Sequence, residues 1–134
     1  MLARSKTLTW ENEPSGFSEG IIGFVYKIIE TDTGMIYFGI KQVQKRIRRK
    51  PLKGTKRVRI CYVESDWRTY NTSSPIMQEK LSKHPENYRK IIMRCCTSKT
   101  ELKAFEAYCQ LEYYIAGDWD KLYNEVINLR LRIR

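Results

Sequence analysis

Two strand-forming runs joined by a short turn constrain the fold of this chain more than any other feature. Residues 21–29 are rich in β-branched and aromatic side chains, which is typical of a strand. The next residues, Thr31-Asp32-Thr33-Gly34, are typical of a hairpin turn, because Gly34 can take the left-handed backbone conformation that such turns need. Residues 35–40 then read as the returning strand. We therefore predict an antiparallel hairpin over residues 21–40.

The length of the turn also predicts the register of this hairpin. With a four-residue turn, Glu30 pairs with Met35. Ile28 then lies opposite Tyr37, and Tyr26 lies diagonally from Tyr37 on the same face. A three-residue turn would put the two tyrosines on opposite faces. We expect both tyrosines to lie within reach of one shared site.

The remaining elements follow from capping signals and apolar runs. Ser74-Pro75 indicates the start of a helix that ends near Lys83, and residues 91–96 indicate a third strand. Ser98-Lys99-Thr100-Glu101 is a capping box that opens a long last helix, which ends at Gly117. The apolar stripe of that helix is Leu102, Phe105, Cys109, Tyr113 and Ala116.

These elements predict an α+β fold, in which a small antiparallel sheet of about three strands is flanked by helices. The chain has 134 residues, which fits a single domain. Residues 1–20 are polar, with Pro14, Gly16 and Gly20, and are expected to form an N-terminal arm. Residues 21–134 then form one domain that carries a basic insertion at 41–66.

The basic insertion indicates the partner. Residues 41–59 contain ten lysines and arginines and no acidic residue, and the whole chain has a formal net charge of +10. Pro51 and Gly54 interrupt this stretch, so we expect a short helix followed by a loop. A polyanion is the simplest partner for such a charge, and nucleic acid is the commonest one. The residues expected to contact it are Lys41, Arg48, Arg49, Lys50 and Arg57.

Several function classes are excluded. His84 is the single histidine and lies in a polar stretch, which excludes a histidine-based metal site or catalytic triad. The four cysteines have no paired spacing, so they are expected to be free thiols rather than zinc ligands or disulfides. The sequence shows no signal peptide and no apolar run long enough for a membrane span, so we expect an intracellular, cytoplasmic protein.

Two motifs on the hairpin resemble those of a known family. Gly23-Phe24-Val25-Tyr26 and Tyr37-Phe38-Gly39 resemble the paired motifs of the GIY-YIG nuclease superfamily. A basic segment, a helix, a strand, a glutamate-bearing helix and Tyr123-Asn124 follow in the order of that family. Residues 64–74 also resemble a free-standing, phage-type branch of it. The resemblance covers roughly residues 20–128.

The resemblance implies hydrolysis of phosphodiester bonds in DNA. It implies that Tyr26 helps to activate the attacking water and that Tyr37 orients it. An arginine after the second motif would hold the scissile phosphate, a task that suits its planar fork. Arg46 is closest to the family spacing, Arg48 is next, and Lys41 is a supporting cation.

The resemblance also implies a metal ion, Mg²⁺ or Mn²⁺, held by a glutamate on the last helix. Glu106 is the expected ligand, since it lies a few residues past the helix start. Glu112 stays open as the alternative, because it lies on the opposite edge of the same apolar stripe. Asn124 is expected to support the site by hydrogen bonding.

A polar and aromatic group beside the basic segment could bind nucleic acid as well. Trp67 and Tyr70 could stack on bases, and Ser73 and Ser74 could contact phosphate. The alternative for Ser74 is a plain helix cap.

The sequence therefore predicts a metal-dependent DNA endonuclease. A non-catalytic nucleic-acid-binding protein that keeps the nuclease fold is the alternative, and a basic accessory protein that binds an acidic partner is a third class. The sequence decides neither the DNA target nor whether the protein is a monomer or a homodimer.

Overall fold

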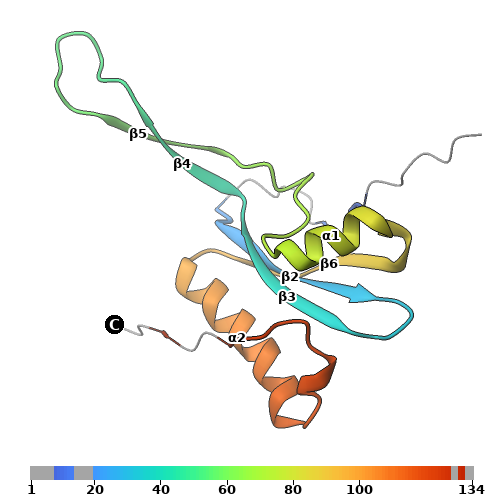
Figure 1. Ribbon diagram of the computed structural model, residues 1–134. Coiled ribbons are helices and arrows are strands. Elements are labelled where there is room, and N and C mark those ends of the chain that lie inside the picture. Colours follow the sequence, from blue (N-terminus) through green and yellow to red (C-terminus); the bar gives the residue numbers. More distant parts are fainter. Residues whose placement is uncertain (1–7, 14–19, 128–129, 132–134) are drawn as a thin grey trace, which may run out of the picture.

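The computed structural model describes residues 8–13, 20–127 and 130–131, which form a sheet with one helix on each face (Figure 1). The main sheet has four strands in the order β1-β6-β2-β3, and a separate two-stranded sheet pairs β4 with β5. The strands are β1 (Trp10–Glu11), β2 (Gly23–Glu30), β3 (Ile36–Gln42), β4 (Gln44–Arg49), β5 (Arg59–Glu64) and β6 (Tyr88–Cys96). The helices are α1 (Pro75–Lys83) and α2 (Lys99–Ile115), with single 3₁₀ turns at Pro85–Asn87 and Trp119–Lys121. The predicted α+β class is confirmed.

The central hairpin has the predicted register. β2 and β3 are antiparallel, with Ile28 opposite Tyr37 and Tyr26 opposite Gly39. The Glu30 N–H donates to the Met35 carbonyl at 2.9 Å, which closes the four-residue turn. Tyr26 and Tyr37 therefore lie on one face of the hairpin, with ring centroids 6.3 Å apart.

The sheet differs from the prediction at its other edge. Trp10 and Glu11 form β1, which pairs in parallel with β6, so the sheet has four strands and is mixed. This part of the predicted N-terminal arm belongs to the core because the Trp10 indole is buried against Phe24 and Tyr26. The rest of the predicted arm, residues 1–7 and 14–19, lies outside the described residues.

The sheet separates two apolar cores. The core on the α1 side contains Phe24, Tyr26, Ile28, Trp67, Met77 and Leu81. On the α2 side, Leu102 packs against Val25 and Cys96, and Cys109 packs against Ile36 and Phe38. Because successive strand residues point to opposite faces, Tyr26 faces α1 whereas Val25 faces α2.

Both helices begin at their predicted caps. The Ser74 hydroxyl accepts from the Met77 N–H at 3.4 Å, and the Ser98 hydroxyl accepts from the Glu101 N–H at 3.1 Å. Helix α2 stops at Ile115, just before Gly117 with its positive φ of 81°. The predicted stripe of α2 is buried or half-buried except for Ala116, which is exposed.

The prediction of a short helix in the basic insertion is wrong. Residues 44–49 and 59–64 pair as antiparallel strands, and residues 50–58 connect them in a long loop that contains both Pro51 and Gly54. We call this hairpin, residues 44–64, the basic ribbon; it reaches out from the main sheet (Figure 1). Val43 alone separates β3 from β4, and its buried backbone accepts from the Ser65 N–H at 2.6 Å and donates to the Ile22 carbonyl at 2.8 Å.

The cysteines form no disulfide, and the histidine lies at the surface. All four cysteines are free thiols, and the side chain of His84 is 65% exposed beside Glu86. Within the described residues, no helix has the length and apolar character needed to cross a membrane.

The close packing of Tyr26 on Gly39 provides a test of this fold. A Cβ atom at position 39 would collide with the ring and the hydroxyl of Tyr26. We expect Gly39→Ala to lower the free energy of unfolding by about 1–3 kcal/mol, the usual cost of overpacking a core. Urea denaturation measures this cost.

The matched control repeats the change in a Tyr26→Ala background. There the added methyl group has no ring to displace, so its cost should largely disappear. An equal loss of stability in both backgrounds would show that contact with the Tyr26 ring is not the reason for the glycine at position 39.

Candidate active site

The first motif tyrosine lies deep in the core. Tyr26 is 0% exposed, and its hydroxyl, which lies over Gly39 of β3, donates to Thr72 Oγ1 at 3.4 Å. Burial raises the pKa of the Tyr26 hydroxyl well above its ordinary value. The hydroxyl is therefore neutral near pH 7 and acts as a hydrogen-bond donor.

The second motif tyrosine lies nearer to solvent. Tyr37 is half-buried and lines a hollow together with Ser74, Tyr123 and Asn124. Tyr70 packs edge-on against Tyr26 with ring centroids 6.4 Å apart. The three tyrosines thus form one aromatic group at the outer edge of β3.

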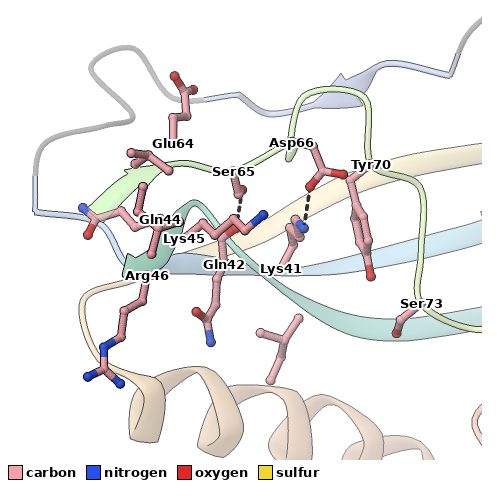
Figure 2. Close-up of a pocket in the computed structure, with 13 residues that line it drawn as sticks. Lys41, Gln42, Gln44, Lys45, Arg46, Glu64, Ser65, Asp66, Tyr70 and Ser73 are labelled. Carbon is pink, nitrogen blue, oxygen red and sulfur yellow. Dashed lines mark hydrogen bonds and ion pairs between the residues drawn. The ribbon is translucent and has the colours of Figure 1, made fainter. Parts of the chain in front are cut away.

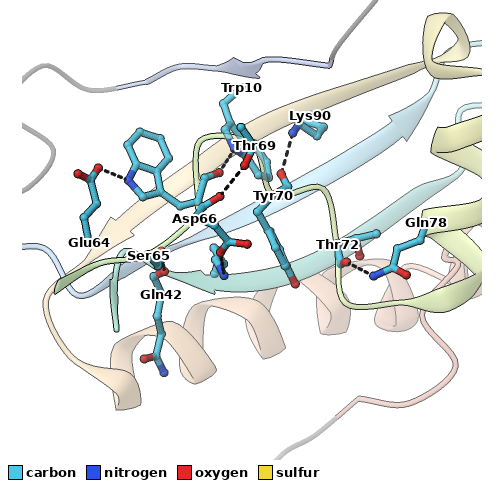
Figure 3. A network of polar contacts seen from close by, with 12 residues as sticks. Trp10, Gln42, Glu64, Ser65, Asp66, Thr69, Tyr70, Thr72, Gln78 and Lys90 are labelled. Carbon is cyan, nitrogen blue, oxygen red and sulfur yellow. Dashed lines mark hydrogen bonds and ion pairs between the residues drawn. The ribbon is translucent and has the colours of Figure 1, made fainter. Parts of the chain in front are cut away.

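Residues 65–74 form a loop that covers this aromatic group (Figure 3). The loop is held from below by Lys90, which is fully buried and donates to the Tyr70 carbonyl at 2.8 Å and to Asn71 Oδ1 at 2.9 Å. Gln78 Nε2 donates to the Thr72 carbonyl at 2.7 Å, which ties the end of the loop to α1. These bonds fix the position of the Thr72 hydroxyl above Tyr26.

A cleft runs along the edge of β3 to the base of the basic ribbon (Figure 2). We call it the β3-edge cleft. Its polar and charged lining residues are Lys41, Gln42, Gln44, Lys45, Arg46, Glu64, Ser65, Asp66, Tyr70 and Ser73. Ser73 lines this cleft and Ser74 lines the hollow around Tyr37, so the two depressions adjoin.

Lys41 is the best-positioned cation in the cleft. Its Nζ lies 4.1 Å from the centroid of the Tyr70 ring and 2.8 Å from Asp66 Oδ1. The hydrogen bond from Lys41 lowers the pKa of Asp66. The side chain of Lys41 is 18% exposed, so its ammonium group is both held in place and open to an anion in the cleft.

The two basic residues of β4 in the cleft diverge. Lys45 and Arg46 are adjacent on a strand, so their side chains leave it on opposite faces. Figure 2 shows Lys45 reaching toward Lys41, whereas Arg46 points away from Tyr70 and Ser73. Of the two, Lys45 is the residue whose side chain points toward the aromatic group.

The expected metal ligand lies in the other layer. Glu106 belongs to α2, whose apolar residues pack on the sheet face opposite to Tyr26. Burial raises the pKa of Glu106 to about 7. Glu112, the alternative ligand, is exposed and accepts from the Tyr108 hydroxyl at 3.2 Å.

The donor set fits a hard, hydrated cation rather than zinc. Among the described residues, no three His, Cys, Asp or Glu side chains lie close enough together to hold a metal. Mg²⁺ needs only one or two carboxylates, because water fills its other positions. Gln110 follows Glu106 by one turn on the same side of α2, and its buried Oε1 has no hydrogen-bond partner among the described residues. Gln110 thus offers one oxygen atom that has no partner among the described residues, one turn from the carboxyl of Glu106.

Three further predicted site residues have structural partners. The expectation that Trp67 stacks on bases is wrong, because its indole is 1% exposed and donates to Glu64 Oε1 at 2.8 Å. Ser74 caps α1, the alternative considered for it. The Asn124 side chain accepts from the Phe38 N–H and donates to the Phe38 carbonyl, both at 2.9 Å, and so supports the outer edge of β3.

The other predicted nucleic-acid contacts are free to reach a partner. Arg48, Arg49, Lys50 and Arg57 are all exposed on the basic ribbon, and Ser73 is exposed in the cleft.

Sequence reasoning missed Lys45, Thr72 and Lys90. Lys45 carries no signal that distinguishes it from the neighbouring basic residues. Thr72 acts through Tyr26, from which it is separated by 46 positions. Lys90 is the one with a local signal, since a lysine stands next to the apolar run that begins at Ile91.

The chain matches a known protein family. The family model described as putative endonuclease segE, GIY-YIG domain, matches residues 9–127. No match was found among curated proteins or solved structures.

The half-buried carboxyl of Glu106 predicts a pH-dependent effect on stability. Its pKa of about 7 lies above the ordinary value of 4.5, so the folded chain holds a proton that the unfolded chain has lost between these values. The free energy of unfolding therefore falls as the pH rises through this window. In EDTA, Glu106→Gln should melt a few degrees above the unmodified protein at pH 8, where ~1 kcal/mol corresponds to roughly 4 °C. The difference should close by pH 4.

Glu112→Gln is the matched control, since it removes the same charge from an exposed position of α2. It should leave the melting temperature nearly unchanged at both pH values. Equal melting curves for the two variants at pH 8 would contradict the burial of Glu106.

Proposed function

Because this chain belongs to the GIY-YIG family of nuclease domains, we propose that it is an endonuclease that hydrolyses phosphodiester bonds of DNA with Mg²⁺ or Mn²⁺. One observation carries the proposal: Tyr37, which shares its face of the hairpin with Tyr26, lines a hollow that adjoins, at Ser73 and Ser74, the cleft whose walls carry Lys41 and Lys45. An aromatic group beside basic side chains suits a phosphate with an attacking water next to it.

The two tyrosines have different roles in this proposal. Tyr37 is the one that reaches solvent, so we assign it the contact with the attacking water. The buried hydroxyl of Tyr26 is a poor base, because its pKa is raised. Its role is to hold Thr72, and with it the covering loop, at the edge of the cleft.

Lys41 and Lys45 bind the phosphate in this proposal. An ammonium group is a compact point charge that suits a phosphate oxygen. Asp66 holds Lys41 in place from the exposed side of the cleft. Arg46 stands where the cleft meets the basic ribbon, so it contacts the DNA backbone on the outer side of the scissile bond.

Glu106 and Gln110 are the residues that would hold the metal ion. Bound there, on the face of the sheet opposite to Tyr26, the metal would supply positive charge to a phosphate and lower the pKa of a water molecule. The raised pKa of Glu106 supports this assignment, since a carboxyl that burial makes hard to ionise gains most from a neighbouring cation. An ionised Glu106 and the free Oε1 of Gln110 present oxygen atoms of the kind that Mg²⁺ prefers.

Cleavage of supercoiled plasmid tests the proposal. With Mg²⁺ or Mn²⁺ the protein should produce nicked or linear DNA, and EDTA should stop the reaction. Tyr37→Phe should slow cleavage by about 10²- to 10⁴-fold, the usual contribution of a positioned proton-transfer group. DNA affinity, measured by fluorescence anisotropy in EDTA, should stay the same, since this loss concerns the reaction step.

The two glutamates of α2 provide matched variants. Glu106→Gln should abolish cleavage in Mg²⁺, and Glu112→Gln should cut like the unmodified protein. A dead Glu112 variant with an active Glu106 variant would place the metal on the outer side of α2. If the unmodified protein binds DNA but does not cut it with either metal, the chain is a binding protein that keeps the nuclease fold, which the burial of Tyr26 would favour.

A further inference from the structure

The two faces of the basic ribbon are chemically different. In an antiparallel pair, residues opposite each other share a face, and successive residues alternate. Arg46 lies opposite Tyr62, and Arg48 lies opposite Ile60, so these four residues share one face, which we call the arginine-tyrosine face. Lys45, Ile47, Arg49, Arg59, Cys61 and Val63 share the other face.

The arginine-tyrosine face exposes apolar groups that the fold does not use. Tyr62 is 65% exposed and Ile60 is 47% exposed, whereas Ile47, Cys61 and Val63 on the other face are half-buried. A two-stranded hairpin is marginally stable by itself. A ribbon that projects from the domain with a bare tyrosine and isoleucine therefore has a surface suited to a partner.

We propose that the arginine-tyrosine face lies in the major groove of duplex DNA and reads base edges, so that the ribbon selects where this nuclease cuts. The inference rests on the proposed DNA substrate and adds a reading surface at Arg48, Ile60 and Tyr62. Arg46 lies on the same face but lines the β3-edge cleft, where it keeps its contact with the DNA backbone. Arg48 is the residue that would bond a guanine edge, and Ile60 would contact a thymine methyl group.

The dimensions and the charge of the ribbon support this partner. The major groove of B-form DNA is about 12 Å wide and admits a two-stranded ribbon. Six residues per strand span about 20 Å, enough to cross several base pairs. The deep, narrow major groove of double-stranded RNA does not admit such a ribbon. The basic residues of the connecting loop, including Lys50 and Arg57, then lie near the phosphates that flank the groove.

Selection from a randomised 30-base-pair duplex library tests the proposal. The full chain is used with Ca²⁺ in place of the proposed metal, so that binding is read without cleavage. The selection should yield a preferred sequence, and methylation of guanine N7 within it should interfere with binding. A minor-groove competitor such as distamycin should not displace the protein. No preferred sequence, or displacement by distamycin, would overturn the proposal.

Arg48 and Arg49 form a matched pair, because they are adjacent, exposed arginines on opposite faces of β4. Arg48→Ala should reduce the preference for the selected duplex over a scrambled one by about 5- to 150-fold. Arg49→Ala should weaken binding to both duplexes equally and flatten the slope of log K against log salt by about one. Equal effects of the two substitutions on the preference would overturn the assignment of faces. Unchanged melting curves confirm that both variants are folded.

The failure of this inference is distinguishable from the failure of the proposed function. A protein that cuts plasmid but selects no sequence, or binds double-stranded RNA as tightly as DNA, overturns the reading face alone. A protein that selects a sequence but never cuts leaves the reading face in place and overturns the nuclease proposal.

Discussion

The buried ammonium group of Lys90 is the interaction on which the site depends. It lies 4.2 Å from the centroid of the Trp10 ring, and its two oxygen partners, the Tyr70 carbonyl and Asn71 Oδ1, both belong to the covering loop. Burial lowers the pKa of Lys90 to about 8, so the group is still mostly charged at pH 7. Loss of the partners of a buried charge costs about 3–5 kcal/mol. One buried charge therefore links β1, β6 and the covering loop that forms a wall of the cleft.

Local signals account for the parts of the fold that could be predicted. The turn at residues 31–34 and the caps at Ser74 and Ser98 act over a few residues, so a short window of sequence contains all the information that they need. The basic ribbon could not be predicted in this way. Arginine and lysine suit the surface of a helix as well as that of a strand, and the strand that pairs with β4 begins ten residues after it ends.

The candidate site was predicted as far as it depends on the hairpin. The spacing of Tyr26 and Tyr37 determines their shared face, whereas nothing local shows that the covering loop seals Tyr26 from solvent. The same loop buries Trp67. The residue type alone favours base stacking, but the buried side chain is not available for it. The position of Glu106 relative to the tyrosines could not be predicted from local sequence either. It depends on the packing of α1 and α2 on opposite faces of one sheet.

The single residue between β3 and β4 joins the ribbon to the sheet without a linker segment. Val43 is buried, and its two backbone hydrogen bonds set the angle at which the ribbon leaves the domain. The length of the strands β4 and β5 therefore sets the distance between the cleft and the tip of the ribbon. Ribbons from related chains could thus be exchanged as modules, provided that each strand changes by an even number of residues. An odd change would turn the arginine-tyrosine face away from the side on which it now lies.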